Sequence, residues 1–322
     1  MILEIPEAKF NPKELIPEIT GGGMSNTNGM PLILFLKDKS VLKVTFHFKS
    51  EYDLALERRN EKPKQWQGVN GILIGNIIQE KVPGPNGLGE IYDSYILVNQ
   101  TKKIVKKLND EKDCPVYMKK YFELCQSELD NNGGYDEIAI VHMKEYYGFL
   151  SNLYKSPSMN GFYEIMINSA LFEVAFFYFK IKKYLPGFKH NDLHMENIMI
   201  DPREQVESLM YTKYEDDEGN VFYVPYFGYE LKIIDLGLSE LPEYGIESVL
   251  KNSVSINKTI ETGLETKLLL RFISFGYNWG SVEGVEEKYS KEGFKYDSKL
   301  FDKFKAKKND PRENAVIKTI SF

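Results

Sequence analysis

A short polar loop between two apolar segments constrains this chain more than any other feature of its sequence. The loop runs from His190 to Asn197 and reads HNDLHMEN, which places Asp192 and Asn197 five positions apart. The residues before it, Phe162 to Tyr184, are apolar on nearly every face of a helix, which indicates a helix buried in a helical layer. A carboxylate and an amide on one tight loop can face a single polyanion and its cation. The loop therefore predicts a functional site next to a buried helix.

Two further charged residues sit in apolar strands. Asp235 follows Ile233-Ile234 and precedes Leu236-Gly237, so its carboxylate stands at a strand end and can serve as the main ligand of a metal ion. Lys43 lies inside the apolar run Val41–Val44. A lysine within an apolar strand needs a partner of opposite charge. A nucleotide phosphate together with a glutamate from a helix would supply that partner.

A glycine cluster, Gly21-Gly22-Gly23, precedes the lysine strand. No Gly-Lys-Ser/Thr follows it, so the cluster is not a Walker A loop. The segments Leu32–Leu36 and Val41–Phe48 are rich in leucine, β-branched and aromatic residues and flank a polar turn, which predicts a hairpin. The hairpin would carry Lys43 close to the glycines.

Taken in order, these residues resemble the signature set of the protein kinases. The match comprises Gly21-x-Gly23-x-x-Asn26 at the glycine-rich loop, Lys43 at the strand lysine, His190-x-Asp192-Leu193-x-x-x-Asn197 at the catalytic loop and Asp235-Leu236-Gly237 at the Asp-Phe-Gly motif. The form of the catalytic loop is most similar to the divergent serine/threonine kinases of poxviruses and giant viruses. It is more distantly similar to haspin and to the aminoglycoside and choline phosphotransferases. The resemblance covers roughly residues 15 to 270.

The resemblance implies transfer of the γ-phosphoryl group of ATP to a serine or threonine hydroxyl of a protein. It assigns Asp192 to orient that hydroxyl and accept its proton, and Asn197 and Asp235 to hold Mg²⁺, with Mn²⁺ as an alternative. Lys43 would neutralise the α and β phosphates, and His194 would contact the transferred phosphate.

The remaining nucleotide contacts follow from the same resemblance. They are Gly21, Gly22, Gly23 and Asn26 above the phosphates, and a hinge between the lobes at Val141–Tyr146, which includes Glu145. The backbone of the hinge would read the edge of the adenine. A helix expected at Glu51–Glu61 would pair a glutamate with Lys43, with Glu57 as the first choice and Glu61 as the second.

Several positions depart from the kinase pattern. Asn26 replaces the third glycine, and Asn191 replaces the arginine that often binds an activation-loop phosphate, so we expect activity without phosphorylation of that loop. His194 replaces the lysine that protein-serine kinases usually carry. The interval from Asn197 to Asp235 is long and predicts an inserted hairpin, and no Ala-Pro-Glu follows Asp235.

The order of elements predicts an α+β protein with two lobes, and the resemblance implies a protein-kinase-like fold. Residues 1–145 would form the strand-rich N-terminal lobe, with a helical insertion near 101–130 between strands at Ile91–Val98 and Glu137–His142. Residues 146–322 would form the helix-rich C-terminal lobe, with an inserted hairpin at 201–230 and a helical, charged segment from Glu247 onward.

Composition narrows the class of protein further. The net charge of −6 argues against a protein that simply coats nucleic acid, so we expect no nucleic acid as a specific ligand. Two cysteines, Cys114 and Cys125, exclude a disulfide scaffold and a four-cysteine zinc site. No secretory signal or membrane span is evident, which predicts a cytoplasmic protein, in the host cytoplasm and in the virion if the origin is viral.

Two other functions remain open at the level of sequence. His194 and the missing Ala-Pro-Glu favour a small-molecule kinase of the aminoglycoside or choline type. A non-catalytic pseudokinase scaffold is disfavoured, because Lys43, Asp192, Asn197 and Asp235 are all present.

Overall fold

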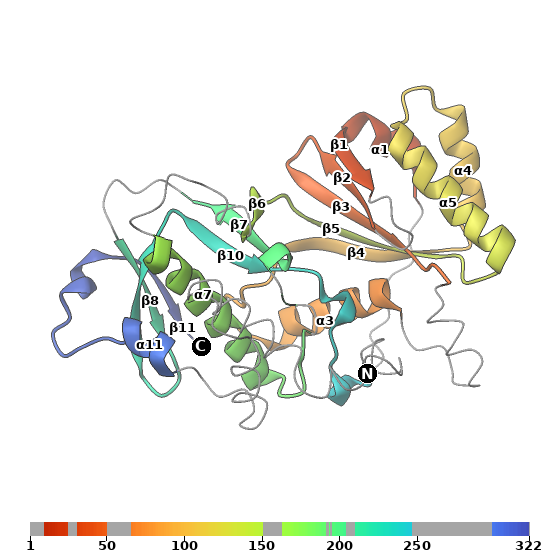
Figure 1. The fold of residues 1–322 in the computed structure, drawn as a ribbon. Helices are drawn as coiled ribbons and strands as arrows, with labels where there is room; N and C mark the ends of the chain where they lie inside the picture. The colour runs from red at the N-terminus through yellow and green to blue at the C-terminus, as the bar shows by residue number, and fades with distance from the viewer. Residues whose placement is uncertain are drawn as a thin grey trace, which may run out of the picture.

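The computed structural model describes residues 10–24, 31–49, 66–150, 163–190, 193, 195–203, 210–246 and 298–321 (Figure 1). These residues form an α+β protein with a strand-rich N-terminal half and a second half built around one long helix, which confirms the fold class expected from the sequence. The helix predicted at Glu51–Glu61 lies outside the described residues.

The N-terminal half is built on one antiparallel sheet with the strand order β1-β2-β3-β5-β4. Its strands are β1 (Ile19–Met24), β2 (Leu32–Leu36), β3 (Ser40–Phe46), β4 (Ile91–Val98) and β5 (Glu137–Lys144). A short helix, α1 (Pro12–Leu15), and a 3-10 turn (Ile16–Glu18) lead into β1. The expected hairpin is β2 with β3, in which Ile33 pairs with Lys43.

Helices cover both faces of this sheet because successive side chains of a strand point to opposite faces. Ile138 and Ile140 of β5 join a core with α4 (Thr101–Asp110) and α5 (Val116–Asn132). Ala139, between them, packs instead with Ile72 of α3 (Gln67–Lys81). Figure 1 shows α3 and the pair α4 and α5 on opposite sides of the sheet.

The second half is organised around α7 (Tyr163–Tyr184), whose residues 169–178 are all buried, as the sequence predicted. Two three-stranded sheets pack near it, with the orders β10-β7-β6 and β11-β8-β9. Their strands are β6 (Gly148–Phe149), β7 (Ile198–Pro202), β8 (Met210–Glu215), β9 (Val221–Tyr226), β10 (Tyr229–Ile233) and β11 (Val316–Ser321). A short helix, α11 (Ser298–Phe304), precedes β11.

An aromatic cluster joins these elements. The ring of Phe172 on α7 contacts the rings of Tyr214 on β8, Phe222 on β9 and Phe301 on α11, with centroids 4.4 to 5.3 Å apart. The β8–β9 hairpin is therefore part of the main core of the second half, not a peripheral addition.

Helix α3 and strand β11 are among the elements that the sequence did not predict. Helix α3 was not predicted, because Gly68, Gly71 and Gly75 lower the helix propensity of the segment. The chain after Glu247 was expected to be helical, but β11 is a strand that pairs in parallel with β8 and buries Ile320. Residues 247–297 lie outside the described part.

Candidate functional site

The backbone brings Asn197 and Asp235 side by side. β7 begins directly after Asn197, and β10 ends two residues before Asp235. The two strands are antiparallel with Ile198 opposite Ile233, and the amide of Ile234 donates to the carbonyl of Asn197 at 3.0 Å. Two residues 38 positions apart in the chain are thus neighbours because the long insertion between them folds away as a hairpin.

Lys43 reaches the same place from the N-terminal half. Its position in the middle of β3 is fixed on both sides, by Ile33 of β2 and by Val141 of β5. Its ammonium Nζ lies 2.8 Å from the carboxylate Oδ1 of Asp235. Both side chains keep contact with solvent, with 24% of Lys43 and 39% of Asp235 exposed, so the ion pair is accessible to a ligand.

Asp235 has an unusual backbone conformation, with φ 62° and ψ 68°. Left-handed conformations are uncommon for residues other than glycine and cluster at functional sites. Burial acts to raise the pKa of the Asp235 carboxyl, but the charge and hydrogen bond of Lys43, with smaller effects from His190 and the amide of Gly237, lower it overall. The group is therefore a carboxylate at neutral pH, which is the form that binds Mg²⁺.

His190 forms a hydrogen bond to the segment that carries Asp235. It is fully buried, and its Nε2 lies 3.0 Å from the carbonyl of Ile234, so Nε2 carries the proton and donates. The hydroxyl of Ser239 donates to the carbonyl of His190 at 3.1 Å. These contacts give His190 a supporting role in the loop.

Helix α3 packs directly against the turn after Asp235. A Cβ added to Gly71 would lie 3.5 Å from the amide nitrogen of Gly237, and one added to Gly237 would lie 3.2 Å from the carbonyl of Gln67. Small residues on both sides let the two backbones approach. The only acidic residue of α3 is Glu80, which lies at its C-terminal end and pairs with Lys81. α3 therefore offers Lys43 no carboxylate.

The glycine cluster adopts a regular structure. Gly21, Gly22 and Gly23 lie in β1 and pair with β2, whereas the sequence placed them in a loop. A Cβ on Gly22 would lie 2.3 Å from the carbonyl of Ile33, so the close approach of the two strands requires glycine there. β1 lies at the edge of the sheet.

Backbone amides of the hinge segment already form hydrogen bonds within the protein. The amide of Glu145 donates to the carbonyl of Lys39 at 3.1 Å, and the amide of Tyr147 donates to the carbonyl of Ile200 at 3.1 Å. Both donors are already used within the protein. A base read by this segment would need other backbone groups than the amide of Glu145.

Four residues of the predicted site lie outside the described residues. They are Asp192, His194, Asn26 and Glu57, and the alternative Glu61 is also among those left out. Their roles stay predictions. Within the described part, no group of three or more His, Cys, Asp or Glu side chains could hold a metal ion. An amide and one carboxylate completed by phosphate oxygens would still suit Mg²⁺, which typically takes few protein ligands at a nucleotide site.

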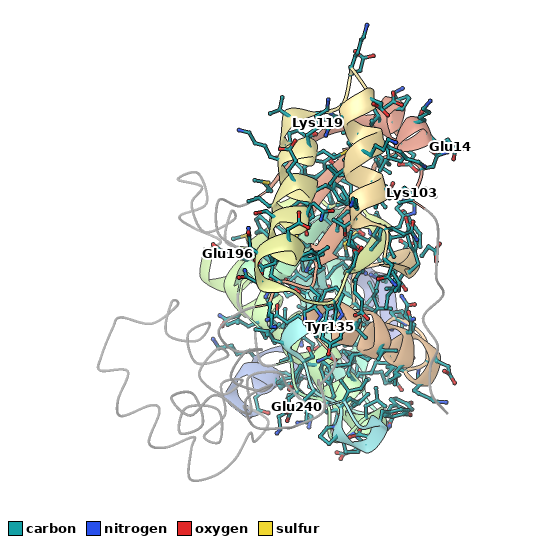
Figure 2. All side chains as sticks on the ribbon, turned by 90° about the vertical axis from the view of Figure 1, so that its right-hand side faces the viewer. Glu14, Lys103, Lys119, Tyr135, Glu196 and Glu240 are labelled. Atoms are coloured by element: carbon teal, nitrogen blue, oxygen red, sulfur yellow. The ribbon has the colours of Figure 1, made fainter. Side chains whose placement is uncertain are left out.

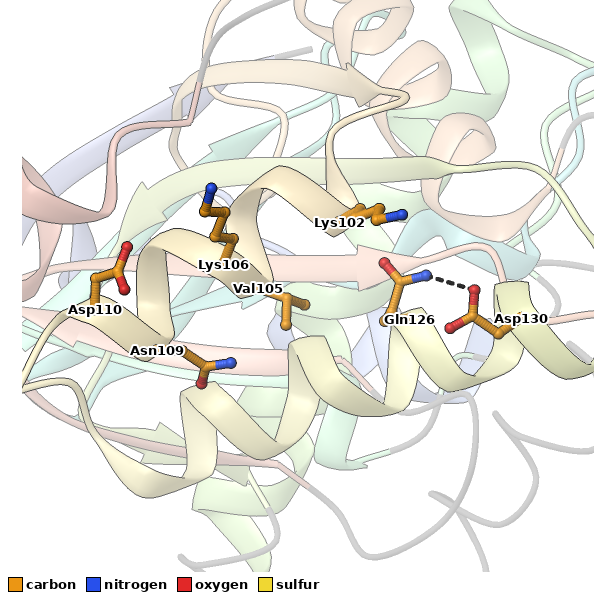
Figure 3. A pocket seen from close by; sticks show the side chains of 7 residues that line it. All are labelled: Lys102, Val105, Lys106, Asn109, Asp110, Gln126 and Asp130. Carbon is orange, nitrogen blue, oxygen red and sulfur yellow. Dashed lines mark hydrogen bonds between the residues drawn. The ribbon is translucent and has the colours of Figure 1, made fainter.

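A groove elsewhere on the molecule has a different character. It lies between α4 and α5 and is lined by Lys102, Val105, Lys106, Asn109, Asp110, Gln126 and Asp130 (Figure 3). On the α5 side, the amide of Gln126 donates to the carboxylate of Asp130, one turn along the same helix, at 2.9 Å. Figure 2 shows α4 and α5, with Lys103 and Lys119, at the end of the molecule opposite Glu240. The mixed charges and the open shape give the groove no evident ligand.

Comparison with known proteins adds little to this geometry. No family model matches the sequence, and no curated protein matches it. Among solved structures, one match is the crystal structure of the BubR1 kinase domain, with a TM-score of 0.39 and 12% identity over 70% of this chain and 48% of that chain. The chain thus spans about half the length of the protein chain that it matches. So low a score leaves the interpretation of the site to the geometry of Lys43, Asn197 and Asp235.

No helix in the described part of the chain has both the length and the apolar character needed to cross a membrane.

Proposed function

We propose that this protein is an ATP-dependent phosphotransferase that transfers the γ-phosphoryl group to a serine or threonine hydroxyl of a protein. The observation that carries the proposal is the 2.8 Å contact between Lys43 and Asp235. These two residues lie 192 positions apart and were selected from the sequence as the phosphate-binding and metal-binding groups. Their convergence beside Asn197 is what such a site requires.

Each residue has a role in the proposed transfer. The carboxylate of Asp235, kept ionised beside Lys43, and the side chain of Asn197 would hold Mg²⁺ or Mn²⁺, and the ion would neutralise phosphate charge. Lys43 would then turn from Asp235 to the α and β phosphates. Asp192 would orient the acceptor hydroxyl and accept its proton, with His194 beside the transferred phosphate.

The finer assignment follows the catalytic-loop sequence. The form HNDLHMEN supports likeness to the serine/threonine kinases of large DNA viruses, and with it a place in the host cytoplasm. The acceptor class rests on that likeness.

The proposal is tested by γ-phosphoryl transfer from labelled ATP in Mg²⁺ or Mn²⁺, with casein and a basic protein as acceptors and a panel of amino alcohols beside them. Wild type should label serine or threonine of a protein, and Asp192→Asn should lose activity by on the order of 10²-fold. Labelling of an amino alcohol alone would replace the protein kinase with a small-molecule kinase. Nucleotide binding without any transfer would indicate a pseudokinase.

A further inference from the structure

The segment between α3 and β4 links the two halves next to the site. We call residues Val82–Glu90, which read VPGPNGLGE, the junction loop. The amide of Gly89 donates to the carbonyl of Ile233 at 2.9 Å, and the amide of Ile233 donates to the carbonyl of Gly87 at 2.7 Å. The junction loop therefore pairs with the end of β10, two residues before Asp235. A shift of the loop would therefore act on the strand end that leads to Asp235.

The junction loop is seated closely on α7. Gly87 has φ +71°, and a Cβ there would lie 2.3 Å from the ring of Phe177. Gly84 has φ +63°, and a Cβ there would lie 3.7 Å from Nζ of Lys180. The loop backbone thus lies against two residues that are three positions apart on α7, and it can do so at Gly87 only without a side chain.

Lys180 also connects the junction loop and α7 to a third element, β11. Its side chain is 1% exposed, and its ammonium donates to the carbonyl of Pro85 in the junction loop and to the carbonyl of Ser321 in β11, both at 2.9 Å. Within the described part of the chain it makes no ion pair. A buried charge that is balanced only by carbonyl dipoles is a poor source of stability, since an apolar side chain of similar size avoids the cost of desolvation. Its geometry instead joins α7, the junction loop and β11 at one atom.

β11 also reaches β10 directly. The ammonium of Lys318 contacts Oε1 of Glu230, three residues before Ile233. Ile320 is buried in the main core, and β11 pairs with β8 from Val316 to Ser321. Two routes therefore run from β11 to the strand before Asp235, one through Lys318 and one through Lys180 and the junction loop.

We propose that Lys180 is a positioning residue for the candidate site: together with Lys318 it lets β11 hold the end of β10, and thereby sets the orientation of Asp235. The expected effect on nucleotide binding rests on the proposed function. The expected effect on the end of β10 does not, because hydrogen exchange at the amide of Ile233 is measured without any ligand.

Hydrogen exchange tests the structural part. In Lys180→Met, the amide protons of Gly89 and Ile233 should exchange on the order of tenfold faster than in wild type, because the loop loses its anchor. Lys182→Met, on the same helix with its ammonium over the ring of Tyr178, is the matched control and should leave both rates unchanged. Unchanged exchange at Ile233 in a folded Lys180→Met protein would overturn the proposal. If that variant does not fold, Lys318→Met takes its place, because it removes the contact between β11 and Glu230 at a partly exposed position. Unchanged exchange at Ile233 in this variant would likewise overturn the proposal.

Nucleotide binding tests the consequence for the site. Lys180→Met should weaken the affinity for ATP in Mg²⁺ on the order of tenfold and leave binding in EDTA unchanged, since only the metal ligand is displaced. A merely structural role would lower the unfolding temperature without this dependence on Mg²⁺. If wild type binds no nucleotide, the proposed function fails, and the exchange rates alone decide the role of Lys180. If wild type binds and Lys180→Met binds equally well, the positioning role is wrong.

Discussion

The two halves of the molecule differ in what they bury. Among the described residues, every buried charged side chain belongs to the second half: Glu173, Lys180, Asp201, Glu240 and Asp310. The core of the N-terminal half is apolar, and its polar members are neutral, such as Tyr121, whose hydroxyl accepts from the amide of Phe46 and donates to the carbonyl of Val44.

The difference shows how each half positions its part of the site. Lys43 is placed by strand register, since β3 is paired on both sides over an apolar layer. Asp235 is placed by hydrogen bonds from His190 and the junction loop and by the close packing of α3, all at one short strand end. A register is robust to single changes, whereas a set of polar contacts fails when one member is removed. The predictions below test this contrast.

The largest effect is expected where the two halves meet. Asp235→Asn should lower phosphoryl transfer on the order of 10²-fold or more, because a neutral amide replaces the anionic metal ligand. The loss should persist at saturating ATP. Leu236→Met, a change of similar volume beside it, serves as the control and should retain most of the activity. Asp235→Asn with full activity would remove this residue from the site.

Glu173 provides the largest expected effect on stability. Burial raises the pKa of its carboxyl to about 7, although the amide of Leu231 donates to it at 3.0 Å and opposes the shift. Between the unfolded value of 4.5 and about 7, the folded protein retains a proton that the unfolded chain has released. Stability from this group is therefore greatest at low pH and falls as the pH rises through that window, by about 3 kcal/mol.

Glu173→Gln removes the titration but keeps an oxygen that accepts from Leu231. Relative to wild type, this variant should gain unfolding free energy as the pH is raised from 5 to 8, measured in urea at both values. A difference between the two proteins that does not change with pH would show that Glu173 does not titrate in this range.

The N-terminal half should respond less and without dependence on pH. Tyr121→Phe leaves the carbonyl of Val44 and the amide of Phe46 without their side-chain partner in a buried layer, which should cost about 1–3 kcal/mol. Urea unfolding at pH 5 and pH 8 should give the same loss. A loss that differed strongly between the two values would mean that this half also depends on charge.

The smallest effect is expected for an exposed ion pair. Lys37 and Glu18 lie 3.9 Å apart, with more than half of each side chain exposed. Lys37→Met should change the free energy of unfolding by less than about 0.5 kcal/mol, because solvent screens such pairs. A loss above 1 kcal/mol would show that surface charges stabilise the N-terminal half, contrary to the expectation that apolar packing and strand register hold it.

The same contrast explains how much the sequence could predict. The strands around Lys43 and the buried helix at 163–184 follow from hydrophobic patterning, and the motifs singled out Asn197 and Asp235, which the structure places together. Local propensity does not predict helix α3, because its glycines serve close packing against the Asp235 turn, a tertiary requirement that outweighs propensity.

Other features could not be read from a single sequence. Strand β11 depends on a parallel partner about a hundred residues earlier, and nothing local marks that pairing. Lys180 stands in an apolar helix, and its role appears only when Pro85 and Ser321 are brought to it. Polar contacts between distant segments leave no periodic pattern in the sequence, so only the three-dimensional structure identifies them.

The most direct test of the central claim measures ATP affinity by calorimetry in Mg²⁺ and in EDTA for wild type, Lys43→Met and Asp235→Asn. The account predicts that Mg²⁺ strengthens binding to wild type, that Lys43→Met weakens it in both conditions, and that Asp235→Asn abolishes only the benefit of Mg²⁺. Affinity that is unchanged by both substitutions would contradict the claim that these two residues bind a metal-bound triphosphate.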